Sequence, residues 1–216
     1  MKNYRYVLFD LDGTLTESGE GIINSAVYAL KKFGIEPEIS TMTKFLGPPL
    51  KDSFRDFYGF DDEKCEQAVK YYREYYTTKG IFENRVYDGV EECLKKLSEA
   101  GLHLAVATSK PQVFAVKILE HFHLAQYFDY IGGAELDGSR SVKADVIMHT
   151  LKNCGVNDRS QVIMAGDRQH DVLGAKALGI DCIGMLYGYG TREELSQAGA
   201  VYIAETPLEA AKWLLG

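Results

Sequence analysis

Residues 6–15 read Tyr-Val-Leu-Phe-Asp-Leu-Asp-Gly-Thr-Leu, and this stretch decides how the rest of the chain is interpreted. Its first four residues are apolar, β-branched or aromatic, which predicts a short strand buried on both faces of a parallel sheet. Asp10 and Asp12 follow at once, and Gly13 ends the run. Because an unpaired carboxylate is costly to bury, a cation is expected beside the pair. These residues alone are compatible with two interpretations: a metal site, or two solvated acids at a strand end.

The composition is that of an ordinary globular protein and excludes several function classes. Of 216 residues, 46% are hydrophobic and 25% are charged. The formal net charge is −7 and the basic residues are scattered, so no nucleic-acid polymer is expected as a partner. No apolar run reaches the roughly 18–20 residues of a membrane span, and Asp10 cuts short the N-terminal apolar run. We therefore expect a cytoplasmic protein, without a membrane partner, whose four widely spaced cysteines stay reduced.

The pattern of the chain changes near residue 83. Residues 16–82 contain helical patterns, including one over 19–33, and no convincing strand. From residue 84 onward short strands and helices alternate, with strands expected over 102–107, 130–132, 161–165 and 182–186, the last clear strand of the parallel set, and a small strand over 201–203. This alternation predicts an α/β fold: a doubly wound parallel sheet formed by residues 1–15 and 83–216, with residues 16–82 as a helical insert. Two capping boxes, Thr191 with Glu194 and Thr206 with Glu209, predict helix starts near the C-terminus.

Polar residues follow the predicted strands where ligands would bind. In an open α/β sheet, ligands bind outside the carboxyl ends of the strands. The residues at those positions are Asp10 and Asp12, then Thr108-Ser109-Lys110, then Gly166-Asp167 with Asp171 four residues on, and Lys143 begins a helix between them.

This ordered set resembles the four motifs of the haloacid dehalogenase-like hydrolase superfamily. The insert after the first motif resembles the α-helical cap of that superfamily, over a Rossmann-like core. The whole chain is similar to the branch that contains phosphoglycolate phosphatases and 5′-nucleotidase-like phosphatases. The resemblance implies Mg²⁺-dependent hydrolysis of small phosphomonoesters, such as nucleoside 5′-monophosphates or phosphoglycolate, through an aspartyl-phosphate intermediate.

The resemblance also implies catalytic roles for individual residues. Asp10 would attack phosphorus, and Asp12 would be the general acid for the leaving alcohol and then the base for the attacking water. Lys143 would contact both the nucleophile and the transferring phosphoryl group. Thr108 and the Ser109 amide would hold phosphoryl oxygens.

The same resemblance implies a metal site. Four acids together would repel a phosphate dianion, so a divalent cation is required, and Mg²⁺ suits an all-oxygen shell. It would be held by Asp10, the backbone oxygen of Asp12, and Asp167. Asp171 would bind through water or orient the ligands.

Other residues carry weaker expectations. Gly47 and Pro48, in a loop between helices of the insert, are the candidate substrate contacts there. Four tyrosines of the last long helix of the insert could stack on a nucleobase, although core packing is the simpler interpretation: Tyr71, Tyr72, Tyr75 and Tyr76. The roles of Lys110, Arg168 and His170 stay open, with an ion pair to a nearby acid expected for Arg168 and a solvated side chain for His170.

Two alternatives to a phosphatase of small phosphorylated metabolites remain. A phosphomutase would use the same aspartyl-phosphate and return the phosphoryl group to another hydroxyl. A non-catalytic phosphate-binding regulator would keep the fold without turnover. Halide displacement is disfavoured, because dehalogenases of the superfamily are not expected to carry the second acid of the first motif, Asp12. The chain is expected to be a monomer or a small homo-oligomer.

Overall fold

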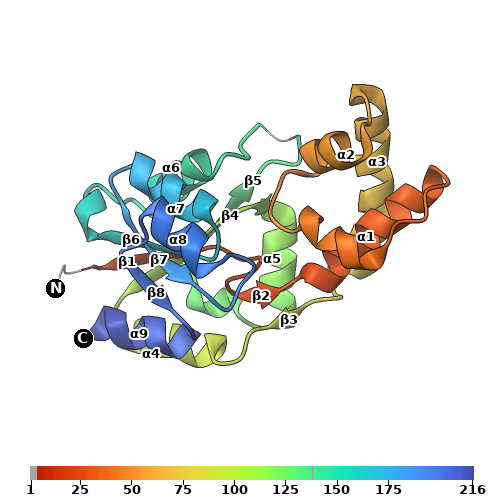
Figure 1. The fold of residues 1–216 in the computed structure, drawn as a ribbon. Coiled ribbons are helices and arrows are strands. Elements are labelled where there is room, and N and C mark those ends of the chain that lie inside the picture. The colour runs from red at the N-terminus through yellow and green to blue at the C-terminus, as the bar shows by residue number, and fades with distance from the viewer. Residues whose placement is uncertain (1–3, 138) are drawn as a thin grey trace. The chain divides into compact units, whose positions relative to one another are not determined.

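The structure, a computed structural model, describes residues 4–137 and 139–216. These residues divide into two units (Figure 1). One, the core unit, comprises the chain up to Thr16 together with Val86–Gly216, and the other, the inserted unit, comprises Glu17–Arg85. The unit boundaries therefore lie after residues 16 and 85, where the sequence pattern placed them after residues 15 and 82.

The core unit contains a six-stranded sheet in which all neighbouring strands are parallel. Its strand order is β5 (Tyr130–Ala134), β4 (His103–Pro111), β1 (Tyr6–Phe9), β6 (Val162–Gly166), β7 (Asp181–Met185) and β8 (Tyr202–Ala204). The predicted doubly wound α/β fold is confirmed. The prediction that 182–186 is the last strand of the parallel set was wrong, because β8 pairs with β7 and extends the sheet.

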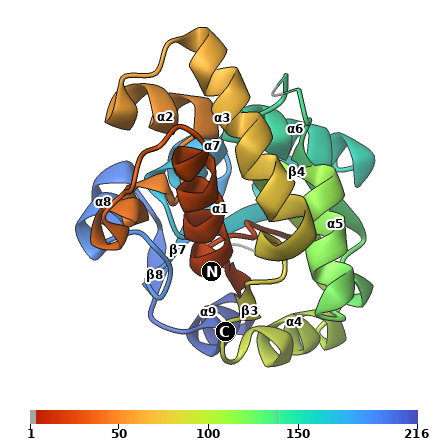
Figure 2. The ribbon, with the colours of Figure 1, turned by 90° about the vertical axis from the view of Figure 1, so that its right-hand side faces the viewer.

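Helices cover both faces of this sheet. One face carries α6 (Lys143–Asn153), α7 (Gln169–Ala177) and α8 (Arg192–Ala198), and the other carries α4 (Val90–Glu99), α5 (Gln112–His121) and α9 (Pro207–Leu215) (Figure 1). Figure 2 shows α9 beside α4, with which it packs. None of the helices within the described residues is long and apolar enough to cross a membrane.

β1 is the central strand, and its burial explains why its sequence is uniformly apolar. Val7, Leu8 and Phe9 are all 2% exposed or less. Leu8 belongs to the cluster beneath α6 and α7, where it packs with Val146 and Met164 among others. Each such aliphatic side chain contributes about 1.5–3 kcal/mol by leaving water. The burial therefore anchors β1 firmly and fixes the position of Asp10, the next residue.

The inserted unit is mainly helical. It contains α1 (Gly19–Lys32), a 3₁₀ helix (Ile39–Phe45), α2 (Leu50–Tyr58), α3 (Asp62–Tyr75) and a π-helical turn (Tyr76–Gly80). Its core is aromatic, with Phe54 packed edge-on against Phe45 and stacked on Phe60. Within this unit, α1 approaches the π-helical turn so closely that a Cβ atom on Gly21 would lie 1.9 Å from the Gly80 carbonyl oxygen. Only glycine fits there.

Two local expectations need correction. The expectation of no strand in 16–82 missed β2 (Thr16–Glu17), which pairs with β3 (Arg85–Val86); two-residue strands are too short to show a period. Thr191 and Thr206 do cap α8 and α9, each accepting a backbone N–H at 3.1 Å. The glutamates do not complete the capping boxes, however, because their carboxylates bind elsewhere: Glu194 to Arg168 and Gln169, and Glu209 to Tyr202 and Glu205.

Candidate active site

The site lies at the carboxyl ends of the three central strands. β1 runs between β4 and β6, so the residues that end these strands meet although they are far apart in sequence. The Asp10 N–H donates to the Ala165 carbonyl at 2.9 Å, which continues the ladder to β6 beyond the last residue of β1. Thr108 ends the regular part of β4, and Asp167 directly follows β6.

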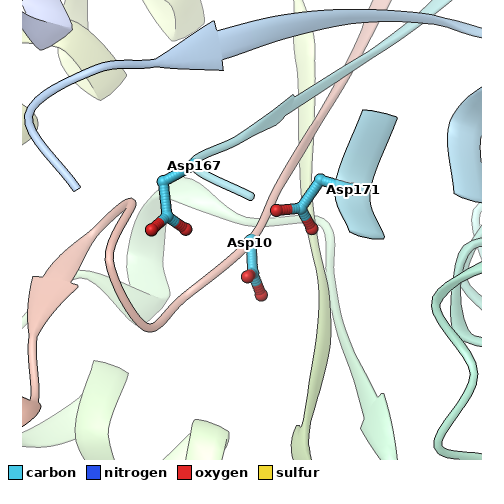
Figure 3. A group of neighbouring side chains, drawn as sticks. All are labelled: Asp10, Asp167 and Asp171. Carbon is cyan, nitrogen blue, oxygen red and sulfur yellow. The ribbon is translucent and has the colours of Figure 1, made fainter. Parts of the chain in front are cut away.

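Three buried carboxylates gather there. Asp10, Asp167 and Asp171 each offer an oxygen within 4.8 Å of the others, and Figure 3 shows their carboxyl groups as neighbours. Asp171 lies in the first turn of α7, where its Oδ2 accepts the Arg168 N–H at 3.1 Å. Like charges at this spacing repel strongly where little water enters, so the cluster requires positive charge.

Lys143 supplies part of that charge from the first residue of α6. Its Nζ lies 2.9 Å from Asp10 Oδ1 and 2.7 Å from Asp171 Oδ1, and it donates to the Ala107 carbonyl at 3.2 Å. The side chain is only 6% exposed. Burial opposes its charge, but attraction to Asp10 and Asp171 outweighs this and raises the pKa of Lys143. The residue is therefore a fixed ammonium group that bridges two of the acids.

Lys143 does not fully neutralise the three acids. Burial raises the pKa of Asp10 from 3.8 to about 6, against the opposing effect of Lys143, and a hydrogen bond from Thr108 also acts to lower it. Burial and the charges of Asp171 and Asp10 raise the pKa of Asp167 well above its ordinary value. Protons thus bind unusually well here, because burial and neighbouring like charges disfavour the ionised carboxylates.

Asp167 is held by a cradle formed from two loops. Its Oδ2 accepts the Tyr189 N–H at 2.7 Å, and its Oδ1 lies 3.4 Å from the Thr14 hydroxyl, which donates to it. Gly13 has φ +83°, and a Cβ atom there would lie 2.2 Å from Asp167 Oδ2. A Cβ atom on Gly188 would lie 2.4 Å from Asp167 Cβ. Sequence analysis missed this contribution of residues 188–190. The signal in the sequence was a Gly-x-Gly that begins two residues after the strand expected over 182–186.

Asp12 forms an ion pair of its own with Lys110, apart from the ion pairs of Lys143. Lys110 Nζ lies 2.5 Å from Asp12 Oδ2, and the lysine side chain is 6% exposed. Thr108 is buried, and its hydroxyl accepts the Lys110 N–H at 3.2 Å, whereas the neighbouring Ser109 is exposed. Lys110, whose role the sequence left open, is thereby placed against the predicted general acid.

The other candidate residues have plainer surroundings. Arg168 forms the expected ion pair with an acid, since its Nε lies 2.8 Å from Glu194 Oε1, and His170 is exposed. Gly47 and Pro48 lie in the inserted unit between the 3₁₀ helix and α2, and Gly47 has φ +107°, a conformation that favours glycine. The four tyrosines pack within that unit: Tyr72 stacks on Tyr76, Tyr71 packs against Phe33, and Tyr75 against Tyr28.

The acids of the core unit fit a divalent cation. Asp10, Asp12, Asp167 and Asp171 carry four negative charges when ionised, and the ammonium groups that contact them are those of Lys110 and Lys143. Asp167 is fully buried, with its nearest hydrogen-bond donors uncharged. Carboxylate oxygens are the ligands that Mg²⁺ favours. The donor set and its excess of negative charge therefore match a Mg²⁺ site built on Asp10 and Asp167.

Comparison with known proteins places the chain in a family. Residues 7–185 match the model of the haloacid dehalogenase-like hydrolases. A 5′-nucleotidase from Pseudomonas aeruginosa is 47% identical over 89% of this chain and 87% of its own length. The tyrosine-protein kinase PtkA from Mycobacterium tuberculosis is 40% identical over 91% of this chain and 67% of its own length. The crystal structure of a predicted phosphatase from Clostridium acetobutylicum, 51% identical, superposes with a TM-score of 0.93 over 98% of both chains.

The chain therefore belongs to the haloacid dehalogenase-like hydrolases, and it is a phosphatase of that family. The residues that carried the resemblance in the sequence are those that the fold brings together at one end of the sheet.

The raised pKa of Asp10 predicts how the stability of the metal-free protein depends on pH. A carboxyl with a folded pKa of about 6 and an unfolded pKa near 3.8 destabilises the fold as pH rises through that window. Asp10→Asn removes this effect. In chelator, the variant should gain roughly 1–3 kcal/mol over the parent protein at pH 7 and little at pH 4. Urea unfolding at both pH values measures this, with the exposed Asp88→Asn as control. An Asp10→Asn protein that is equally or less stable than the parent at pH 7 would contradict a raised pKa of Asp10 in the folded protein.

The proposed metal site predicts stabilisation by Mg²⁺. A ligand at about 100-fold above its Kd adds about 2.7 kcal/mol, which raises the Tm of a protein of this size by roughly 5–10 °C. Asp167→Asn should abolish most of this shift because it removes a charged ligand, whereas Asp88→Asn should keep it. Thermal unfolding with Mg²⁺ or with chelator is the measurement. A full Mg²⁺ shift in Asp167→Asn would rule out Asp167 as a ligand.

Proposed function

We propose that this phosphatase hydrolyses small phosphomonoesters with Asp10 as its nucleophile. The observation that carries the proposal is the position of Asp10. It directly follows the central buried strand, lies among the acids suited to a metal, and has Lys143 Nζ 2.9 Å from its Oδ1. A carboxylate nucleophile splits a difficult hydrolysis into two easier displacements.

In the first displacement, an Asp10 carboxylate oxygen attacks phosphorus while the bond from phosphorus to the ester oxygen breaks. Asp12 gives a proton to the departing oxygen, so that an alcohol leaves rather than an alkoxide. Lys143 contacts Asp10 and faces the transferring group with its positive charge, which offsets the repulsion between two anions. Thr108 and the Ser109 amide hold phosphoryl oxygens.

In the second displacement, water replaces Asp10 on phosphorus. Asp12, now ionised, takes a proton from the water as it attacks, and the bond between phosphorus and Asp10 breaks. Inorganic phosphate leaves, and both carboxylates return to their starting forms. One residue therefore serves as acid and then as base.

The metal and the inserted unit complete the proposal. Mg²⁺ held by Asp10, Asp167 and the backbone oxygen of Asp12 would supply positive charge that neutralises phosphoryl oxygens, with Asp171 orienting the ligands or binding through water. The inserted unit would serve as a cap that excludes bulk water during transfer, with Gly47 and Pro48 at the substrate.

Nucleoside 5′-monophosphates are the substrates we propose first, because the nucleotidase relative is 47% identical over most of both chains. Phosphoglycolate-like esters are the second class. The first displacement would equally serve a transferase. The acceptor would be a sugar hydroxyl in a phosphomutase. It would be a tyrosine hydroxyl in a tyrosine kinase, as the name of the mycobacterial relative suggests. A non-catalytic regulator is disfavoured because Asp10, Asp12 and Lys143 are all present.

Asp10→Asn should lower kcat on the order of 10³-fold or more, because an amide of nearly the same shape cannot attack phosphorus. The assay measures inorganic phosphate released, with Mg²⁺, from a panel of esters that includes nucleoside 5′-monophosphates and phosphoglycolate. Asp88→Asn should retain parental rates.

Substantial activity in Asp10→Asn would refute the role of Asp10. A parent enzyme that interconverts sugar phosphates, or phosphorylates tyrosine, without releasing phosphate would refute hydrolysis.

A further inference from the structure

The Lys110–Asp12 pair is placed where a stabilising role is a poor explanation. Lys110 Nζ lies 2.5 Å from Asp12 Oδ2, and the two side chains are 6% and 22% exposed. A buried ion pair often adds little stability, because removing both charges from water offsets their attraction. Lysine is rarely buried to this degree, so the pair calls for a functional reason.

The backbone around Lys110 is irregular and packs closely against β5. The pairing of β4 with β5 shifts register between Thr108 and Pro111, the segment that contains Lys110. Within this irregular segment, the Lys110 N–H donates to the Thr108 hydroxyl at 3.2 Å. β5 approaches so closely that a Cβ atom on Gly133 would lie 2.7 Å from the Lys110 carbonyl oxygen. Hence the main chain of Lys110 has little freedom to move.

The two lysines of the site contact different acids. Lys143 lies against Asp10 and Asp171, whereas Lys110 lies against Asp12. Lys110 Nζ donates to Oδ2, and among the described residues no hydrogen-bond donor reaches the buried Oδ1 of Asp12. One oxygen of the carboxylate is therefore anchored, and the other is left for a further partner.

We propose that Lys110 is the positioning residue for Asp12, and this rests on the proposed function of Asp12 as general acid and base. Lys110 holds Oδ2 and so fixes the rotation of the carboxyl group, which leaves Oδ1 as the oxygen that carries the proton. The proton passes from Oδ1 to the ester oxygen as its bond to phosphorus breaks, and Oδ1 later receives a proton from the attacking water. Lys110 itself forms no bond to substrate in this role.

The dependence of rate on the leaving group tests this role. Protonation matters for a poor leaving group and hardly at all for a good one, so the loss of a positioned acid is selective. For Lys110→Met, we expect kcat/KM to fall on the order of 10–100-fold with phenyl phosphate. With 4-nitrophenyl phosphate the fall should be less than about threefold, because that departing oxygen needs no proton. kcat/KM is the right parameter, since it reports the first displacement alone.

Matched variants separate positioning from other roles. Lys110→Arg keeps a charged donor and should restore most of the leaving-group selectivity of the parent. In an Asp12→Asn background, Lys110→Met should change kcat/KM by less than about twofold, because residues that act as a unit are not additive. The exposed Lys117→Met on α5 is the control for loss of a lysine. If Lys110→Met lowers the Tm so far that the protein is unfolded under assay conditions, Lys110→Gln replaces it in the same comparison, because glutamine removes the charge but keeps a hydrogen-bond donor.

Each outcome decides the matter. A loss that is equal for both esters, or one that adds fully to Asp12→Asn, would overturn the positioning role and show that Lys110 binds phosphate or supports the fold. That result leaves the proposed hydrolysis untouched. A parent enzyme that releases no phosphate from either ester would instead overturn the proposed function, and the positioning role with it.

Discussion

The site depends on one electrostatic constraint: four carboxylates stand at one end of the sheet with two lysines against them. Asp10, Asp167 and Asp171 lie within 4.8 Å of one another and are buried, so their mutual repulsion is screened little by water. Burial of the apolar core around the site offsets the cost of this arrangement. The buried central strand β1 fixes Asp10, and the first turn of α7 fixes Asp171. The residual negative charge suits the site to a divalent cation.

The same constraint explains how two acids separated by one residue acquire different surroundings. Asp10 points into the carboxylate cluster and meets Lys143, a buried ammonium group shared with Asp171. Asp12 is more exposed and, among the described residues, forms an ion pair with Lys110. A group that is buried among charges suits attack on phosphorus, and a group with one anchored and one unpartnered oxygen, among the described residues, suits proton transfer. The division of labour proposed for the pair follows from these two environments.

Sequence alone predicted what depends on side-chain pattern. The apolar run of residues 6–9 predicted the central strand, and the acids after β1 and β6 indicated where a cation would bind, since parallel strands end at one edge. The parts that were missed depend on the backbone. Tyr189 holds Asp167 through its backbone N–H. Every non-proline residue has this group, so the residue type does not predict the contact. Lys110, which contacts Asp12, lies where the pairing of β4 with β5 shifts register, and the sequence analysis did not predict this irregularity. β8 has only three residues, too few for a clear period.

Chemical trapping of the phosphorylated enzyme tests the central claim most directly. An aspartyl-phosphate is an acyl phosphate, which borohydride reduces to homoserine, whereas a free aspartate does not react. The enzyme is mixed with Mg²⁺ and a nucleoside 5′-monophosphate, quenched during turnover, reduced and digested, and the peptide that contains Asp10 is examined by mass spectrometry. The account predicts homoserine at position 10 that depends on substrate and is absent in Asp10→Asn. Turnover with unmodified Asp10, or with homoserine at Asp12 or Asp167, would contradict it.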